Sequence, residues 1–234
     1  MKTESANYFV TDSAAAASAM STGYKVNNGS IFMTPDGQSP STLLQVAKES
    51  GKRIGLISTA PIYDASPAAF SVHAQSRRDS EMIVNQYLAL EPEVLMGGRR
   101  NYFLPTSIPG GKRQDNLNVV DAFKAKDYQY LSSPGDLSSI QKNRVLGLFA
   151  VEDIDCEIDR DPHEMPNLSQ MLSAGLQVLS SQSKRDKGFV LFAENENTGS
   201  AGHQNDVAAL MRDLWAFDDA VRSHWISRRR TQIR

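Results

Sequence analysis

The chain has little of what marks several large classes of protein. It contains one cysteine in 234 residues, Cys156, which excludes an intrachain disulfide and a cysteine-rich zinc motif. No apolar run reaches the roughly 20 residues of a membrane-spanning helix, and the polar residues 1–7 lack the apolar core of a signal peptide. The net charge of −2 gives no overall attraction to nucleic acid or to a membrane. A composition with 40% hydrophobic residues is typical of a globular protein with a substantial core.

Helical and strand patterns alternate along the chain. Helical spacing is found at residues 42–50, 80–90, 118–126, 168–180 and 213–222. Apolar strand patterns are found at 53–58, 93–96, 128–131, 145–150 and 188–193, the last expected to be a buried strand, and surface loops are expected at 101–118 and 153–166. This alternation predicts an α/β fold with a mainly parallel central sheet flanked by helices. Such sheets bind ligands at the carboxyl ends of their strands.

The most informative stretch is residues 10–17, where a β-branched, strand-like approach ends in Asp12 and Ser13 before four alanines open a helix. At a helix N-terminus, free backbone N–H groups and the helix dipole favour an anion. The Ser13 hydroxyl in that field is a candidate nucleophile toward a phosphoryl group, provided that its pKa is lowered. Taken alone, the motif favours the simpler interpretation that Ser13 caps an alanine-rich helix.

Other polar side chains follow strand-like runs. Asp64 and Ser66 offer oxygen atoms suited to a hard cation such as magnesium, although an Asx turn before Pro67 is the simpler interpretation of these two residues alone. The planar guanidinium of Arg77 can bind two phosphate oxygens. Glu194 ends the last apolar run, where a carboxylate needs a cation or a hydrogen-bond donor.

Four blocks, taken in order, resemble the alkaline phosphatase family. Residues 10–29 (VTDSAAAASAMSTGYKVNNG) resemble its nucleophile motif. The other blocks are residues 57–77 (ISTAPIYDASPAAFSVHAQSR), 94–103 (VLMGGRRNYF) and 192–206 (FAENENTGSAGHQND). The resemblance predicts a partial alkaline phosphatase-like domain over residues 1–222, followed by an irregular basic tail over 223–234.

The resemblance implies a phosphate monoester hydrolase that acts through a phosphoserine intermediate at a zinc and magnesium site. Ser13 would then be the nucleophile and also a zinc ligand. Arg77 matches the family's substrate-binding arginine, and Asp12 would orient it. Arg78, beside it, is interpreted as a surface residue.

The resemblance also implies metal ligands. Ser66 and Glu194 match magnesium ligands, with Asp64 behind them, and His203 matches a zinc ligand. At the position of Gly199 the family carries an aspartate that binds the same zinc, and glycine has no side chain to replace it.

Both ends of the chain are expected to be truncated relative to the family. Only 12 residues precede Ser13, so the family's metal-bridging aspartate has no counterpart, and neither do its later zinc-binding residues. A catalytic zinc normally needs about three protein ligands. We therefore expect the zinc pair not to assemble and turnover to be strongly reduced or absent.

Two alternatives of other kinds remain at the level of the sequence. In the first alternative to the monoester hydrolase, the chain is a non-catalytic fragment that binds phosphate or another chain. In the second, it is a sister-superfamily phosphodiesterase or sulfatase. The Asp-Ser-Ala sequence together with Arg77 favours monoesters. The resemblance further implies a homodimer for the full-length protein and a periplasmic or extracellular location, with no nucleic-acid partner.

Overall fold

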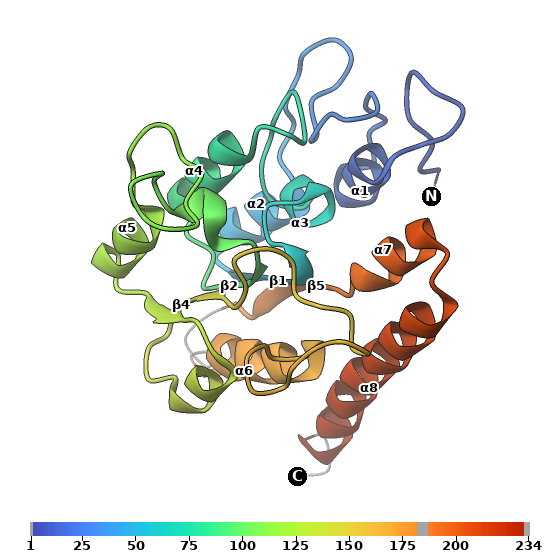
Figure 1. Ribbon diagram of the computed structural model, residues 1–234. Helices are drawn as coiled ribbons and strands as arrows, with labels where there is room; N and C mark the ends of the chain where they lie inside the picture. Colours follow the sequence, from blue (N-terminus) through green and yellow to red (C-terminus); the bar gives the residue numbers. More distant parts are fainter. Residues whose placement is uncertain (1, 182–186, 232–234) are drawn as a thin grey trace.

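The computed structural model describes residues 2–181 and 187–231, which form a five-stranded sheet between layers of helices (Figure 1). All neighbouring strands are parallel, in the order β3-β4-β2-β1-β5. The strands are β1 (Arg53–Pro61), β2 (Val94–Gly98), β3 (Gln129–Leu131), β4 (Val145–Leu148) and β5 (Phe189–Glu194). The predicted α/β fold with a parallel central sheet is confirmed.

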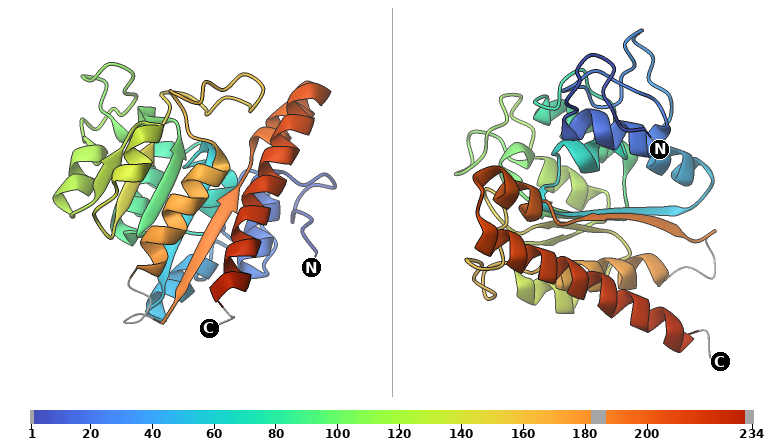
Figure 2. Two further views of the ribbon diagram at one scale, coloured as in Figure 1. Left: turned by 90° about the horizontal axis from the view of Figure 1, so that it is seen from below. Right: turned by 90° about the vertical axis from the view of Figure 1, so that its right-hand side faces the viewer.

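Helices cover both faces of the sheet, as the edge-on view in Figure 2 (right) shows. Helices α1 to α5 lie on one face, and α6 packs against β1 and β2 on the other, with α8 beside it. The helices are α1 (Ser13–Thr22), α2 (Leu43–Glu49), α3 (Ala65–Ala69), α4 (Ser80–Leu90), α5 (Val119–Ala125), α6 (Leu168–Ser180), α7 (Asn197–Gln204) and α8 (Val207–Thr231), with short 3-10 helices η1 (Arg100–Phe103) and η2 (Pro134–Ser139).

The period of two along the strands divides the core into two parts. On β2, Leu95 joins the cluster beneath α2 to α5, whereas Val94 and Met96 join the cluster beneath α6. Gly175 lets α6 approach closely, because an added Cβ there would lie 2.7 Å from Ile57 Cδ1. The sheet is therefore held rigidly from both sides, and the ends of its strands are fixed in position.

Several sequence predictions about local structure are wrong. Val10 and Thr11 form no strand, and Val10 is 76% exposed. β-Branched residues favour extended backbone, but a strand also needs a neighbour to pair with.

The loop predicted at 101–118 is not all surface, because the side chains of Asn101 and Arg113 are fully buried. The basic tail is not irregular over 223–231, since α8 continues to Thr231. No glycine or proline interrupts that helix.

Strand β5 lies at the edge of the sheet, where it pairs with β1 alone among the described residues. Its side chains are only partly buried, so the prediction of a fully buried strand is wrong. An apolar run indicates that the faces of a strand are covered but does not reveal how many neighbours it has. No helix in the described ranges is both long and apolar enough to cross a membrane.

Candidate functional site

Ser13 is the first residue of α1, and Asp12 is the residue that caps it. Asp12 Oδ1 accepts a hydrogen bond from the Ala15 N–H at 2.9 Å, and Oδ2 accepts one from the Gly29 N–H at 2.9 Å. The interpretation of Ser13 as the helix cap is therefore wrong, because its neighbour performs that task. The Ser13 hydroxyl is left exposed at the positive end of the helix dipole.

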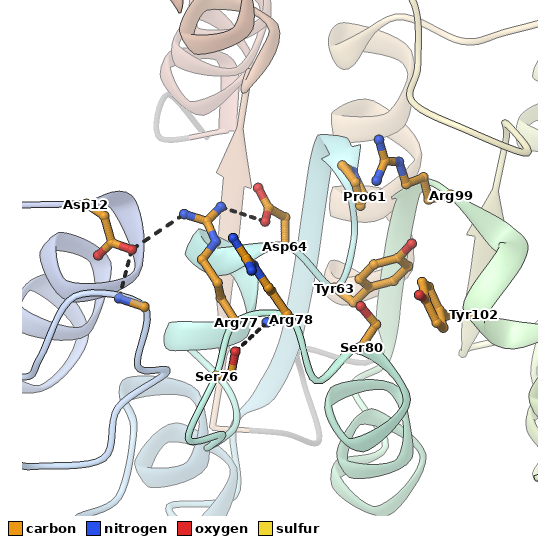
Figure 3. A pocket seen from close by; sticks show the side chains of 11 residues that line it. Asp12, Pro61, Tyr63, Asp64, Ser76, Arg77, Arg78, Ser80, Arg99 and Tyr102 are labelled. Carbon is orange, nitrogen blue, oxygen red and sulfur yellow. Dashed lines mark hydrogen bonds and ion pairs between the residues drawn. The ribbon is translucent and has the colours of Figure 1, made fainter. Parts of the chain in front are cut away.

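Arg77 joins the start of α1 to the start of α3. Its Nη1 donates to Ser13 Oγ at 2.7 Å and lies 3.7 Å from Asp12 Oδ2, and its Nη2 donates to Asp64 Oδ1 at 2.8 Å (Figure 3). The guanidinium is thus held from two sides by carboxylates and presented to the serine. Asp64 makes no side-chain cap for α3, so the turn interpretation of this residue does not hold.

This arrangement is suited to binding an anion. A guanidinium and the N-terminus of α1 face the same hydroxyl, and both favour negative charge there. The carboxyl end of a strand also supplies a side chain to this site, since Asp64 follows the end of β1 by three residues. Ser13 and Arg77 are 64 residues apart in the sequence, so the fold creates this pair.

Glu194 ends β5 in a partly buried position next to these groups. Its Oε2 accepts a hydrogen bond from Ser58 Oγ at 3.0 Å. Burial raises the pKa of its carboxyl, and so does the charge of Asp64, whereas hydrogen bonds from Ser66 and Ser58 and the charge of Arg77 act in the opposite direction. Among the described residues, its hydrogen-bond donors are the hydroxyls of Ser58 and Ser66, and a cation would stabilise the charged form of such a carboxylate.

The residues predicted to bind magnesium fit that ion. Ser66 and Glu194 lie within hydrogen-bond reach of each other, and Asp64 contributes a third oxygen-bearing side chain nearby. Magnesium prefers oxygen donors and binds through only one or two carboxylates. The donor chemistry at the end of β5 therefore suits a hard divalent cation.

The residues predicted to bind zinc do not fit. His203 is exposed in the last turn of α7. Gly199 has no side chain to bind a metal, and the nearest carboxylate to its Cβ position is that of Glu196, whose Oε1 would lie 3.6 Å from an added Cβ. Burial raises the pKa of Glu196 to about 7, which disfavours the charged form that a metal ligand needs. In the part of the chain that the structure describes, no three His, Cys, Asp or Glu side chains gather closely enough to hold a metal ion. A catalytic zinc needs about three such ligands.

A cavity of about 710 Å³ opens beside Arg77 (Figure 3). Its walls include Asp12, Asp64, Arg77, Arg78, Tyr63 and Tyr102. Asp12, Asp64 and Arg77 are predicted site residues, and Arg78 is exposed, which agrees with its interpretation as a surface residue. The two tyrosines were not predicted. Both tyrosines stand inside the blocks at 57–77 and 94–103, which is the signal that could have found them.

Comparisons with known proteins agree with this architecture. The family model described as alkaline phosphatase matches residues 1–227. The chain is 36% identical to the repressible alkaline phosphatase of Saccharomyces cerevisiae over 94% of its length and 42% of the yeast protein's. It superposes on the crystal structure of Thermus thermophilus alkaline phosphatase with a TM-score of 0.87 and 34% identity, covering 95% of this chain and 46% of that one.

A more distant structure, a variant of the alkaline phosphatase from the Antarctic bacterium TAB5, has Mg bound in its M3 site. It is 25% identical, with a TM-score of 0.81, and the match covers 99% of this chain and 64% of that protein. The chain spans less than half the length of the yeast and Thermus proteins. The match of the family model over nearly the whole chain shows that the chain belongs to the alkaline phosphatase family.

Proposed function

We propose that this chain carries the nucleophile and the phosphoryl-binding arginine of a phosphate monoester hydrolase. The observation that carries the proposal is the 2.7 Å contact between Arg77 Nη1 and Ser13 Oγ at the N-terminus of α1. A hydroxyl beside a fixed guanidinium and a helix dipole lies where the charge of a phosphoryl group is stabilised. Family membership supports the same activity.

In the proposed reaction, Ser13 Oγ attacks the phosphorus of a monoester in line with the leaving oxygen. The Oγ–P bond forms as the P–O bond to the alcohol breaks, and the hydroxyl proton ends on the released alcohol. Arg77 turns its two Nη groups from the serine and Asp64 toward the phosphoryl oxygens, where they offset the charge. Water then attacks the phosphoserine, releases phosphate and returns a proton to Ser13 Oγ.

Ser66 and Glu194 would hold magnesium, with Asp64 nearby, and the TAB5 structure with Mg supports such a site. When bound there, magnesium supplies positive charge beside the phosphoryl group. A zinc site is not formed in the same way, because the described residues offer no cluster of three His, Cys, Asp or Glu ligands. We therefore propose that the 234-residue chain by itself has low turnover.

The assay that tests this function is hydrolysis of p-nitrophenyl phosphate at alkaline pH, with zinc and magnesium added. The wild-type chain and Ser13→Ala are compared at equal concentration. We expect slow release of p-nitrophenol from the wild type and none above background from Ser13→Ala. Equal rates above background in the two proteins would show that Ser13 takes no part.

A second candidate function is phosphate binding without hydrolysis, favoured by the complete Ser13–Arg77 pair and the incomplete zinc ligands. Calorimetry with inorganic phosphate tests it. Removing a hydrogen bond to a charged group costs about 1.5–3 kcal/mol, so Arg77→Gln should weaken phosphate binding about ten- to hundredfold. Phosphate binding combined with no p-nitrophenol release would select this function. Release of sulfate, or of alcohol from a diester, would instead select a sister activity.

From the family alone we also propose that the full-length protein is a homodimer and acts in the periplasm or outside the cell. The known relatives extend well beyond this chain. The two properties are tested on the full-length protein, by sedimentation and by cell fractionation.

A further inference from the structure

The cavity at Ser13 holds a second guanidinium that the proposed chemistry does not use. Arg78 follows Arg77 directly, and both line the cavity. A tight turn directs them, because the Arg78 N–H donates to Ser76 Oγ at 3.2 Å and the Asp79 N–H to the Ser76 carbonyl at 3.0 Å. Figure 3 shows both side chains extending toward the same end of the cavity. Neighbouring residues in an extended strand would point to opposite sides.

Arg78 differs from the other arginines that line the cavity in having no acidic partner among the described residues. Arg77 is paired with Asp64 and Asp12. Arg99 is paired with Asp153, at 2.8 Å, and with Glu152. Across the described ranges, no hydrogen bond or ion pair involves the Arg78 guanidinium, although its backbone N–H is bonded as described above. Its positive charge is therefore available to a ligand.

Two tyrosines form an aromatic wall of the same cavity. The rings of Tyr63 and Tyr102 meet edge to face with centroids 5.3 Å apart. Tyr63 donates its hydroxyl to the buried Asn101 Oδ1 at 2.7 Å, which fixes its ring in place. Figure 3 places both tyrosines across the cavity from Arg77 and Arg78. A flat aromatic group can pack against such a wall.

Resting on the function proposed above, we propose that this cavity selects aromatic phosphate monoesters that carry a second anionic group, a carboxylate or a phosphate, which Arg78 binds. Consecutive Cα atoms are about 3.8 Å apart, so two guanidinium groups that point the same way match two anions on one small molecule. A cavity of about 710 Å³ has room for a ligand of that size.

Binding measurements test the proposal without requiring turnover. The probes are 3-carboxyphenylphosphonate and benzene-1,3-bisphosphonate, whose second group is anionic, and 3-carbamoylphenylphosphonate, whose second group is neutral. Each is titrated calorimetrically into the full 234-residue chain. An exposed ion pair is worth up to about 1 kcal/mol, so we expect the two probes with an anionic second group to bind about three- to fivefold more tightly than the carbamoyl probe. A preference limited to one of these two probes identifies which second group is bound. Raising the salt concentration should shrink the preference.

Three variants distinguish direct binding by Arg78 from an effect of the overall charge of the protein. Arg78→Gln should reduce the affinity ratio to about one, and Arg78→Lys should keep most of it. Arg222→Gln, which removes the same charge from the exposed surface of α8, should leave the ratio unchanged. Equal affinities on the wild type, or a ratio unaffected by Arg78→Gln, would overturn the proposal. Phosphate binding that depends on Arg77 would still support the phosphoryl site in that case, whereas no binding of any probe would overturn both.

Discussion

At the scale of single residues, the site depends on which partner each charged group has. Asp12 caps α1, which leaves the Ser13 hydroxyl free to meet Arg77. The sequence predicts Ser13 at the start of a helix, and the structure places it there. The sequence could not predict the contact between Ser13 and Arg77, because a pairing across 64 residues depends on the whole fold. The resemblance to a family supplied the pairing that local patterns lack.

Cys156 offers a test of the electrostatics outside the site. Burial, and next the carboxylate of Asp213, raise the pKa of its thiol to about 11. A raised thiol pKa means less thiolate at a given pH, so alkylation at pH 8 should be roughly ten- to hundredfold slower than for an ordinary cysteine. The rate should continue to rise above pH 9.

Iodoacetamide labelling of the folded and the urea-unfolded chain measures this difference. Asp213→Asn should accelerate labelling of the folded chain, because it removes the negative charge next to the thiol. Equal rates for the folded and unfolded chain at pH 8 would contradict the raised pKa.

At the scale of elements, strands were predicted more accurately than their surroundings. The apolar runs located the five strands of the described residues, because strands that lie between two helical layers carry mostly apolar side chains even where burial is partial. The edge position of β5 was not predictable, since strand order depends on contacts distant in sequence. Helices α3 and α7 were not predicted, because Pro67 lies inside α3 and Gly199 and Gly202 lie inside α7, and both residue types disfavour a helix.

The first turn of α1 depends on Asp12 for stability as well as for the geometry of the site. Asp12→Ala removes the bonds to the Ala15 and Gly29 N–H groups and should lower the free energy of unfolding by about 1–2 kcal/mol. Asp12→Asn keeps a capping oxygen and should lose less. Urea titration measures both.

Ser13→Ala is the matched control for this prediction, because Ser13 does not cap the helix. It should change the free energy of unfolding by no more than about 0.5 kcal/mol. A larger loss from Ser13→Ala than from Asp12→Ala would mean that the serine is the cap after all.

At the scale of the whole molecule, the fold brings together Ser13, Arg77 and Glu194, which we propose as the nucleophile, the phosphoryl-binding group and a cation ligand. The described residues do not bring together three side chains that could bind zinc. The chain spans less than half the length of the yeast and Thermus relatives. These facts support phosphorylation of Ser13 as the step within reach of this chain, with slow hydrolysis afterwards. A burst of product followed by a slow phase is the kinetic result expected of such a molecule.

The most direct measurement is rapid acid quenching of the chain with p-nitrophenyl phosphate, followed by peptide mass spectrometry. We expect one phosphoryl group per chain at most, located on Ser13, formed together with an equal amount of p-nitrophenol and strongly reduced in Arg77→Gln. A phosphoryl group on another residue, or p-nitrophenol released with Ser13 unmodified at every time point, would contradict the proposed role of Ser13.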